Sequence, residues 1–125
     1  MKLTPVLIVD AIEPCLPFWV DRLGFTVTVT VPHEDRAGFV ILTKDGVEVM
    51  YQTRASVAAD VPATLDPRGG HSVTLFVEVP DLDAIERALN GAPLIMPRRT
   101  TFYGLVEIGV REPGGTAIIF ATRQA

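Results

Sequence analysis

The chain contains the same order of strand and helix patterns twice within its 125 residues. Thr4 to Val9 (TPVLIV) aligns with Thr74 to Val79 (TLFVEV), and Gly38-Phe39-Val40 aligns with Gly104-Leu105-Val106. In each copy a strand and a helix precede three further strands, and a glycine-containing turn joins the last two. Such a repeat in so short a chain predicts a duplicated βαβββ module, with chance similarity of generic strand patterns as the alternative. We therefore predict an α+β fold.

The first module, residues 1–53, begins this order. Apolar or alternating side chains predict strands in four places: residues 3–9, 26–31, 39–43 and 47–52. Between the first two strands, apolar residues recur at helical spacing from Leu16 to Leu23. Pro14 suits the first helical turn, and Gly24 suits the stop. Asp45-Gly46 between two apolar runs predicts a tight hairpin.

The second module, residues 71–125, follows the same plan. Strands are predicted in four places: residues 73–79, 93–96, 104–110 and 116–122. Asp81 is placed to cap a helix that ends at Asn90-Gly91. Residues 54–70 fit neither module, because prolines and glycines follow a possible helical turn. We therefore predict one domain over 1–125, in which residues 54–70 connect the two modules.

Composition and charge exclude several classes of function. The formal net charge is −4, and no basic cluster exceeds Arg98-Arg99, so a nucleic-acid partner is not expected. No apolar run approaches the ~20 residues that span a bilayer, and the N-terminal pattern lacks the apolar stretch of a signal peptide. The single cysteine, Cys15, excludes an internal disulfide and is expected to be a buried, inert thiol. We expect a cytoplasmic protein with no membrane partner.

Two local signatures carry a resemblance to a known superfamily. Residues 18–25 (FWVDRLGF) are similar to its Phe-Tyr-x-x-x-Leu-Gly-Phe helix end, and residues 112–115 (EPGG) are similar to its Asp-Pro-Asp-Gly turn. With the duplicated order, they resemble the vicinal oxygen chelate superfamily, which includes glyoxalase I, extradiol dioxygenases, fosfomycin-resistance proteins and bleomycin-resistance proteins. The resemblance covers nearly the whole chain except residues 54–70. It is specific for the fold but not for function, because this fold carries many activities.

The resemblance implies that the strands of both modules form a curved cup of mixed sheet, with the helices outside. Alternation along the first strand of each module then assigns sides. The side chains expected to face the helices are those of Pro5, Leu7, Val9, Leu75, Val77 and Val79. The side chains expected in the cup or at its rim are those of Thr4, Val6, Ile8, Thr74, Phe76 and Glu78. Two further sets are each expected to share one strand face: Glu48, Met50 and Gln52, and Ala117, Ile119 and Ala121.

Metalloenzymes of the superfamily hold their ion with His or Gln on each first strand and Glu on later strands. The resemblance places these positions on Thr4, Thr74, Glu48 and Ile119. Only Glu48 is a strong donor, and one carboxylate does not hold a divalent ion, so we predict no metal and no cofactor. The alternative pairs Glu48 with His71, which requires a register shift that turns core residues outward. His33 is expected in a solvated loop over residues 33–36.

Without a metal, the cup is predicted to bind a small molecule, because an apolar concavity with few polar groups suits one. Phe102 and Tyr103 are expected to stack on a planar ligand, whereas Trp19 is expected to anchor the helix to the sheet. Glu107 resembles part of the Arg-Glu-Phe stretch of bleomycin-resistance proteins, and two carboxylates at the cup would favour a cation. Core packing or an outward orientation is the alternative for each residue. The predicted ligand-binding residues are Thr4, Val6, Ile8, Glu48, Met50, Thr74, Phe76, Phe102, Tyr103, Glu107 and Ile119.

The subgroup with the strongest resemblance is the bleomycin-resistance-like one, whose members are homodimers that hold ligands near the subunit interface and catalyse no reaction. The first hypothesis is therefore a metal-free protein that sequesters a planar or cationic molecule. The second is a metal-dependent lyase, isomerase or dioxygenase, and the third is a structural or regulatory dimer with a filled cup. The sequence does not name the ligand or the biological role. It also leaves open whether the modules pair within one chain or swap between subunits.

Overall fold

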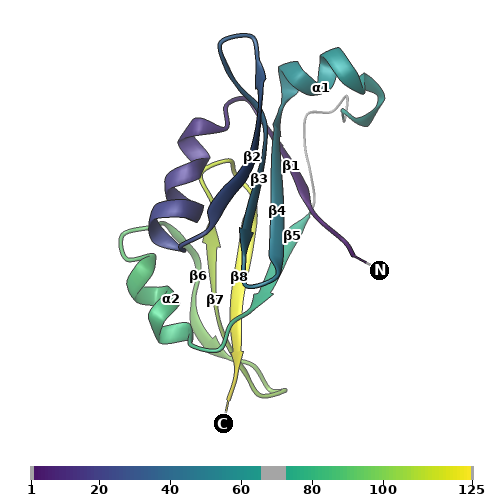
Figure 1. The fold of residues 1–125 in the computed structure, drawn as a ribbon. Helices are drawn as coiled ribbons and strands as arrows, with labels where there is room; N and C mark the ends of the chain where they lie inside the picture. Colours follow the sequence, from purple (N-terminus) through teal and green to yellow (C-terminus); the bar gives the residue numbers. More distant parts are fainter. Residues whose placement is uncertain (1, 66–72, 125) are drawn as a thin grey trace. The chain divides into compact units, whose positions relative to one another are not determined.

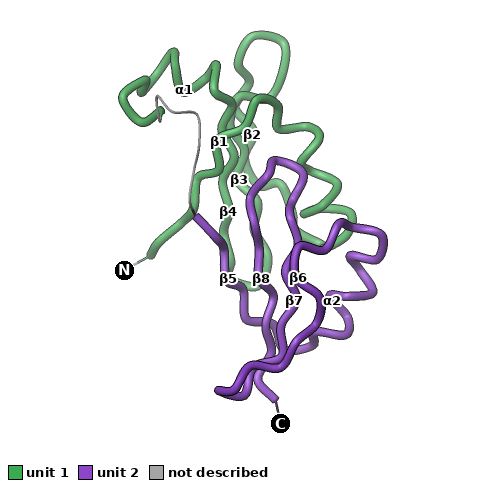
Figure 2. Tube along the Cα trace, turned by 180° about the vertical axis from the view of Figure 1, so that it is seen from behind, with its two compact units in different colours: residues 1–71 green, residues 72–125 purple. Residues whose placement is uncertain are grey.

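The chain forms two compact units, Met1–His71 (unit 1) and Ser72–Ala125 (unit 2), which Figure 2 distinguishes by colour. The computed structural model describes residues 2–65 and 73–124. Each unit holds a four-stranded mixed sheet with helical segments, so the α+β class is confirmed (Figure 1). The alternative ligand His71 lies outside the described residues. No helix in the described ranges is long and apolar enough to cross a membrane.

Unit 1 has its strands in the order β1-β4-β3-β2. The strands are β1 (Val6–Val9), β2 (Thr26–His33), β3 (Arg36–Lys44) and β4 (Val47–Thr53). The helical segments are η1 (Glu13–Cys15), η2 (Pro17–Arg22), α1 (Arg54–Asp60) and η3 (Pro62–Thr64). β1 runs parallel to β4, and the other neighbouring strands are antiparallel. The helix α1 lies in the segment predicted as a connector, and Thr53 caps it by accepting a hydrogen bond from the Ser56 N–H at 3.1 Å.

Unit 2 repeats this topology in the order β5-β8-β7-β6. Its elements are β5 (Thr74–Glu78), α2 (Leu82–Ala88), β6 (Leu94–Thr100), β7 (Leu105–Arg111) and β8 (Ala117–Arg123). β5 is parallel to β8, as β1 is to β4. Asp81 caps α2 as predicted, since its carboxylate accepts the Ala84 N–H at 3.1 Å. The predicted βαβββ order is therefore confirmed in both halves of the chain.

Alternation gives each sheet a helix face and an opposite face, which we call the open face. In unit 1, Trp19 of η2 donates its indole N–H to the Tyr51 hydroxyl of β4 at 2.8 Å, and both side chains are buried. Leu7 lies opposite Tyr51 in the register and is also buried, whereas Val6 beside it is exposed. The predicted sides of β1 and the anchoring role of Trp19 are confirmed. In unit 2, Arg98 of β6 contacts α2 and thereby marks the helix face.

Two local predictions about unit 1 differ from the structure. The predicted helix begins as a short 3-10 turn and continues as a π-helix, because Pro17 has no N–H to donate and interrupts the ordinary hydrogen-bond ladder. The expected loop at 33–36 is a two-residue turn, in which His33 pairs with Arg36 and ends β2. His33 is half-buried because it packs on Gly38, where an added Cβ would meet the His33 Cβ at 2.4 Å.

Other local predictions are confirmed by backbone geometry. Gly24 follows η2 with a φ of 78°, and Phe25 donates its N–H to the Trp19 carbonyl at 2.8 Å. The hairpin between β3 and β4 turns at Asp45 and Gly46, with φ values of 51° and 79°, as a type I′ turn requires. Cys15 is buried.

The Trp19–Tyr51 hydrogen bond gives the first testable prediction. Tyr51→Phe is expected to lower the free energy of unfolding by about 1–3 kcal/mol, because the buried indole N–H loses its acceptor. Chemical denaturation of both proteins measures the difference. Tyr103→Phe is the matched control, since Tyr103 is exposed and a surface change is usually within about 0.5 kcal/mol. Equal stability of the Tyr51 variant and the wild type would contradict the anchoring role.

Candidate functional site

The open face of unit 1 is largely apolar across all four strands. The register and alternation place two rows of side chains on it: Val6, Met50, Ile41 and Val29 in one row, and Ile8, Gln52, Phe39 and Val31 in the next. The edge-strand members Val6, Val29 and Val31 are exposed, and the others are half-buried. Gln52 is the polar exception, and its amide donates to the Ser56 hydroxyl of α1 at 3.1 Å. An apolar surface of this extent with few polar groups has the chemistry of a small-molecule site.

Glu48 is the carboxylate on the same open face, one row beyond Met50. Its Oε1 accepts a hydrogen bond from the Thr4 hydroxyl at 3.2 Å, and its Oε2 lies 3.1 Å from the Lys2 ammonium. The structure thus brings together Thr4 and Glu48, two of the four positions implied for metal ligands. The lysine neutralises the carboxylate and would repel a divalent cation at the same oxygens.

The donor set does not fit a metal ion. In unit 1, Thr4 contacts Glu48 and Val6 pairs with Met50. In unit 2, Thr74 pairs with Ala117 and Phe76 pairs with Ile119. The counterpart of Glu48 in unit 2 is therefore Ala117 rather than the Ile119 named from the resemblance, and neither side chain is a ligand. Over residues 2–65 and 73–124, no group of three or more His, Cys, Asp or Glu is arranged to hold a metal. One carboxylate and two hydroxyls fall short of what zinc or calcium requires.

The open face of unit 2 has smaller side chains and is less regular. One row contains Phe76, Ile119, Gly109 and Met96, and the next contains Glu78, Ala121, Glu107 and Arg99. Phe76 is exposed, and Gly109 pairs closely with Met96 of the neighbouring strand β6, because an added Cβ would meet the Met96 Cβ at 2.9 Å. Glycine at this position lets the two strands approach, and it leaves no side chain between Ile119 and Met96.

Glu107 is buried although it lies on this open face, and only 2% of its side chain is exposed. Its Oε1 accepts a hydrogen bond from the Arg99 Nε at 2.8 Å and forms an ion pair with the Arg99 Nη2 at 2.7 Å. A buried carboxylate requires such a partner, because an unpaired charge is costly to remove from water. Glu107 and Glu48 are thus both ion-paired within their own units, so neither is a spare negative charge that would by itself attract a cation.

Phe102 and Tyr103 form the tip of the β6–β7 hairpin. Phe102 is 100% exposed, and its ring contacts the Tyr103 ring edge-to-face with centroids 4.9 Å apart. Below the tip, Thr101 closes the hairpin by exchanging hydrogen bonds with the backbone of Leu105. The two rings are therefore available to solvent on a braced turn.

The predicted site residues fall into two groups by unit. Unit 1 brings together Thr4, Val6, Ile8, Glu48 and Met50, and unit 2 carries Thr74, Phe76, Glu107, Ile119, Phe102 and Tyr103. Their role in ligand binding stays a prediction. Sequence reasoning missed the open-face residues Phe39, Ile41, Val29 and Val31, and also Arg99. Strict alternation from the Asp45-Gly46 turn would have indicated Phe39 and Ile41, but the register shift in β2 hides Val29 and Val31.

No protein-family model and no curated protein matches the chain. Solved structures match it closely in fold, including a glyoxalase/bleomycin resistance protein/dioxygenase family enzyme from Burkholderia phytofirmans PsJN. That structure has a TM-score of 0.78 and 14% identity, and the match covers 96% of each chain. A bleomycin resistance determinant encoded on the transposon Tn5 matches with a TM-score of 0.72 and 16% identity, over 100% of this chain and 99% of that one. The chain therefore has the fold of these glyoxalase/bleomycin resistance protein/dioxygenase structures.

The structures that share this fold differ in what they are named for. A lactoylglutathione lyase from Agrobacterium tumefaciens also matches, with a TM-score of 0.76 and 12% identity, over 98% of this chain and 92% of that one. The neighbours thus include an enzyme and a resistance determinant. At these identities the likeness establishes the fold alone, so the function has to be argued from the residues of this chain.

Gly109 provides a test of the close pairing between β7 and β6. Gly109→Ala is expected to lower the free energy of unfolding by about 1–3 kcal/mol, because the new Cβ overlaps Met96 and is also 3.3 Å from the Ile95 Cγ1. Denaturation with urea measures the loss. Thr74→Ala, at an exposed position of the same open face, is the control and should change stability by no more than about 0.5 kcal/mol. An unchanged Gly109 variant would mean that β6 moves away without cost.

Proposed function

We propose that this protein binds a planar small molecule on the open face of a sheet and holds it without metal and without catalysing a reaction. The observation that carries this proposal is that both carboxylate oxygens of Glu48 already have partners. Glu48 is the one strong donor among the implied ligand positions, and Lys2 and Thr4 already occupy both of its oxygens. The apolar rows beside it offer area for an uncharged ring system. The proposed role is sequestration in the cytoplasm.

The competing function is a metal-dependent lyase, isomerase or dioxygenase, and metal content separates the two. Protein purified without added metal is expected to contain well under one equivalent of Ni, Zn, Mn or Fe by elemental analysis, because the donor set is too small. Addition of these ions is expected to leave the melting temperature unchanged. Stoichiometric metal that Glu48→Gln removes would overturn the proposal and support the enzyme.

The ion pairs favour a planar ligand over a cationic one. Lys2 neutralises Glu48, and Arg99 neutralises Glu107, so the attraction expected from two free carboxylates is largely cancelled. The exposed Phe102–Tyr103 pair, by contrast, offers ring faces and edges to a flat molecule.

A thermal-shift screen with planar aromatic compounds tests ligand binding. A specific ligand at 100 times its Kd adds about 2.7 kcal/mol of stability. Phe102→Ala and Tyr103→Ala are each expected to weaken binding about two- to ten-fold, since an aromatic contact contributes about 0.5–1.5 kcal/mol. Val61→Ala is the control, because Val61 is an exposed apolar residue at the end of α1, outside the open faces and the edge strands. No shift across the library would favour a purely structural or regulatory dimer.

We also propose that the protein is a homodimer. Exposed apolar side chains on the edge strands β2 and β6 support this proposal: Val29, Val31, Leu94 and Ile95. Exposed apolar edge strands favour association with another chain. Sedimentation analysis at micromolar concentration decides between monomer and dimer.

A further inference from the structure

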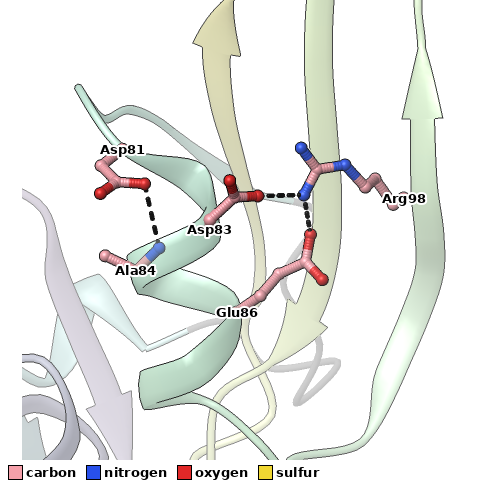
Figure 3. A network of polar contacts seen from close by, with 5 residues as sticks. All are labelled: Asp81, Asp83, Ala84, Glu86 and Arg98. Atoms are coloured by element: carbon pink, nitrogen blue, oxygen red, sulfur yellow. Dashed lines mark hydrogen bonds and ion pairs between the residues drawn. The ribbon is translucent and has the colours of Figure 1, made fainter.

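Two adjacent arginines on β6 have different partners on the two faces of the sheet. Arg98 points to the helix face, where Nη1 donates to Asp83 at 2.9 Å and also to Glu86, both on α2 (Figure 3). Glu86 and Asp83 together raise the pKa of Arg98. Arg99 pairs with Glu107 on the open face. Arg98 is therefore paired with acidic side chains of the helix, whereas Arg99 lies on the face proposed to bind ligand.

The hydrogen bonds of Arg99 leave one edge of its guanidinium available. Nε and Nη2 form one edge: Nε donates to the Glu107 Oε1, and Nη2 is ion-paired with the same oxygen. Within residues 2–65 and 73–124, no hydrogen bond uses Nη1, and 56% of the Arg99 side chain is exposed. Nη1 and the second N–H of Nη2 form the end-on edge, which matches the two oxygens of a carboxylate.

Glu107 holds this guanidinium in place. The buried carboxylate accepts a hydrogen bond from Nε and is ion-paired with Nη2, so Arg99 has less rotamer freedom to lose when a ligand arrives. The neutral pair also avoids the repulsion that an isolated buried carboxylate would exert on an anion. Glu78, in the same row, lies beyond Ala121 and is exposed, so the intervening strand and water weaken its repulsion.

The surroundings of Arg99 suit an aromatic body attached to that carboxylate. Ala121 lies opposite Glu107 and presents only a methyl group, and Phe76 is exposed in the neighbouring row. Phe102 is three residues beyond Arg99 in the same hairpin, which corresponds to roughly 10 Å of extended chain. A ligand of two or three fused rings can therefore contact an aromatic side chain while its acid group reaches Arg99.

We propose that Arg99, positioned by Glu107, binds the carboxylate of a planar aromatic acid. This inference rests on the proposed small-molecule function and names the chemical class of its ligand. Arg99 is the ligand-contacting residue, and Glu107 is a positioning residue that acts through it.

Three probes with the same ring system test the charge preference: 2-naphthoate, 2-naphthamide and 2-naphthylmethylammonium. Calorimetric titration of the full chain is expected to give an affinity for 2-naphthoate about ten- to hundred-fold above that for the amide, because a charge-assisted bidentate pair is formed. The ammonium compound is expected to bind more weakly than the amide. The preference for the acid should decrease as salt concentration rises.

Variants of the two neighbouring arginines provide the matched comparison. Arg99→Gln is expected to abolish the preference for the acid while affinity for the amide is kept, and Arg98→Gln is expected to preserve the preference. Since Arg99→Gln leaves Glu107 buried without a cation, the double variant Arg99→Gln/Glu107→Gln restores a neutral hydrogen-bonded pair and should behave in the same way. Circular dichroism verifies folding of each variant.

Equal affinity for the acid and the amide, or an unchanged preference in the double variant, would overturn this inference and leave the proposed small-molecule function standing. No binding of any naphthalene probe overturns the inference as well, and the planar-compound screen then decides the proposed function separately. Tighter binding of the ammonium compound than of 2-naphthoate would also overturn the inference and would favour a cationic ligand.

Discussion

Side-chain alternation along paired strands is the constraint on which the other features of each unit depend. Leu7 and Tyr51 lie on one face of the unit 1 sheet because β1 and β4 are parallel and in a single register. That register places Tyr51 where Trp19 can reach it. A slip of one residue would exchange the two faces and expose the groups that hold the helix. The positions of Glu48 and Met50 on the opposite face follow from the same pairing.

The local features of the fold were predictable because their causes are local. The Asp81 cap, the Asp45-Gly46 turn and the stop at Gly24 each depend on residues within a few positions in sequence. The π-helix was not predicted, since periodicity does not distinguish hydrogen-bond patterns and the effect of Pro17 depends on the geometry of the preceding turn. His33 was misjudged because charged neighbours suggested a loop, whereas hairpin pairing continues to the turn.

The candidate site was predictable only in part. Alternation along one strand placed Val6, Ile8 and Met50 correctly on one face, but it does not identify which side chains meet. The partners of Glu48 and Glu107 lie 46 and 8 residues away along the chain, as Lys2 and Arg99, and pairing across strands brings them together. Because the sequence does not show these partners, both carboxylates counted toward a cationic ligand, which stood beside a planar one in the sequence-based hypothesis.

Alternation turns the neighbouring Arg98 and Arg99 to opposite faces, and the irregularity in β6 decides which of them meets Glu107. Between Met96 and Arg99 the strand advances three residues while β7 advances two, from Gly109 to Glu107. Because of this bulge, Met96 and Arg99 both lie on the open face, where they pair with Gly109 and Glu107. Loss of one residue there would require either the upstream or the downstream half of the hairpin to invert. The inserted residue thus assigns Arg99 to Glu107 and leaves Arg98 to the acidic side chains of α2. Because the two arginines serve opposite surfaces, selection can alter one without disturbing the other.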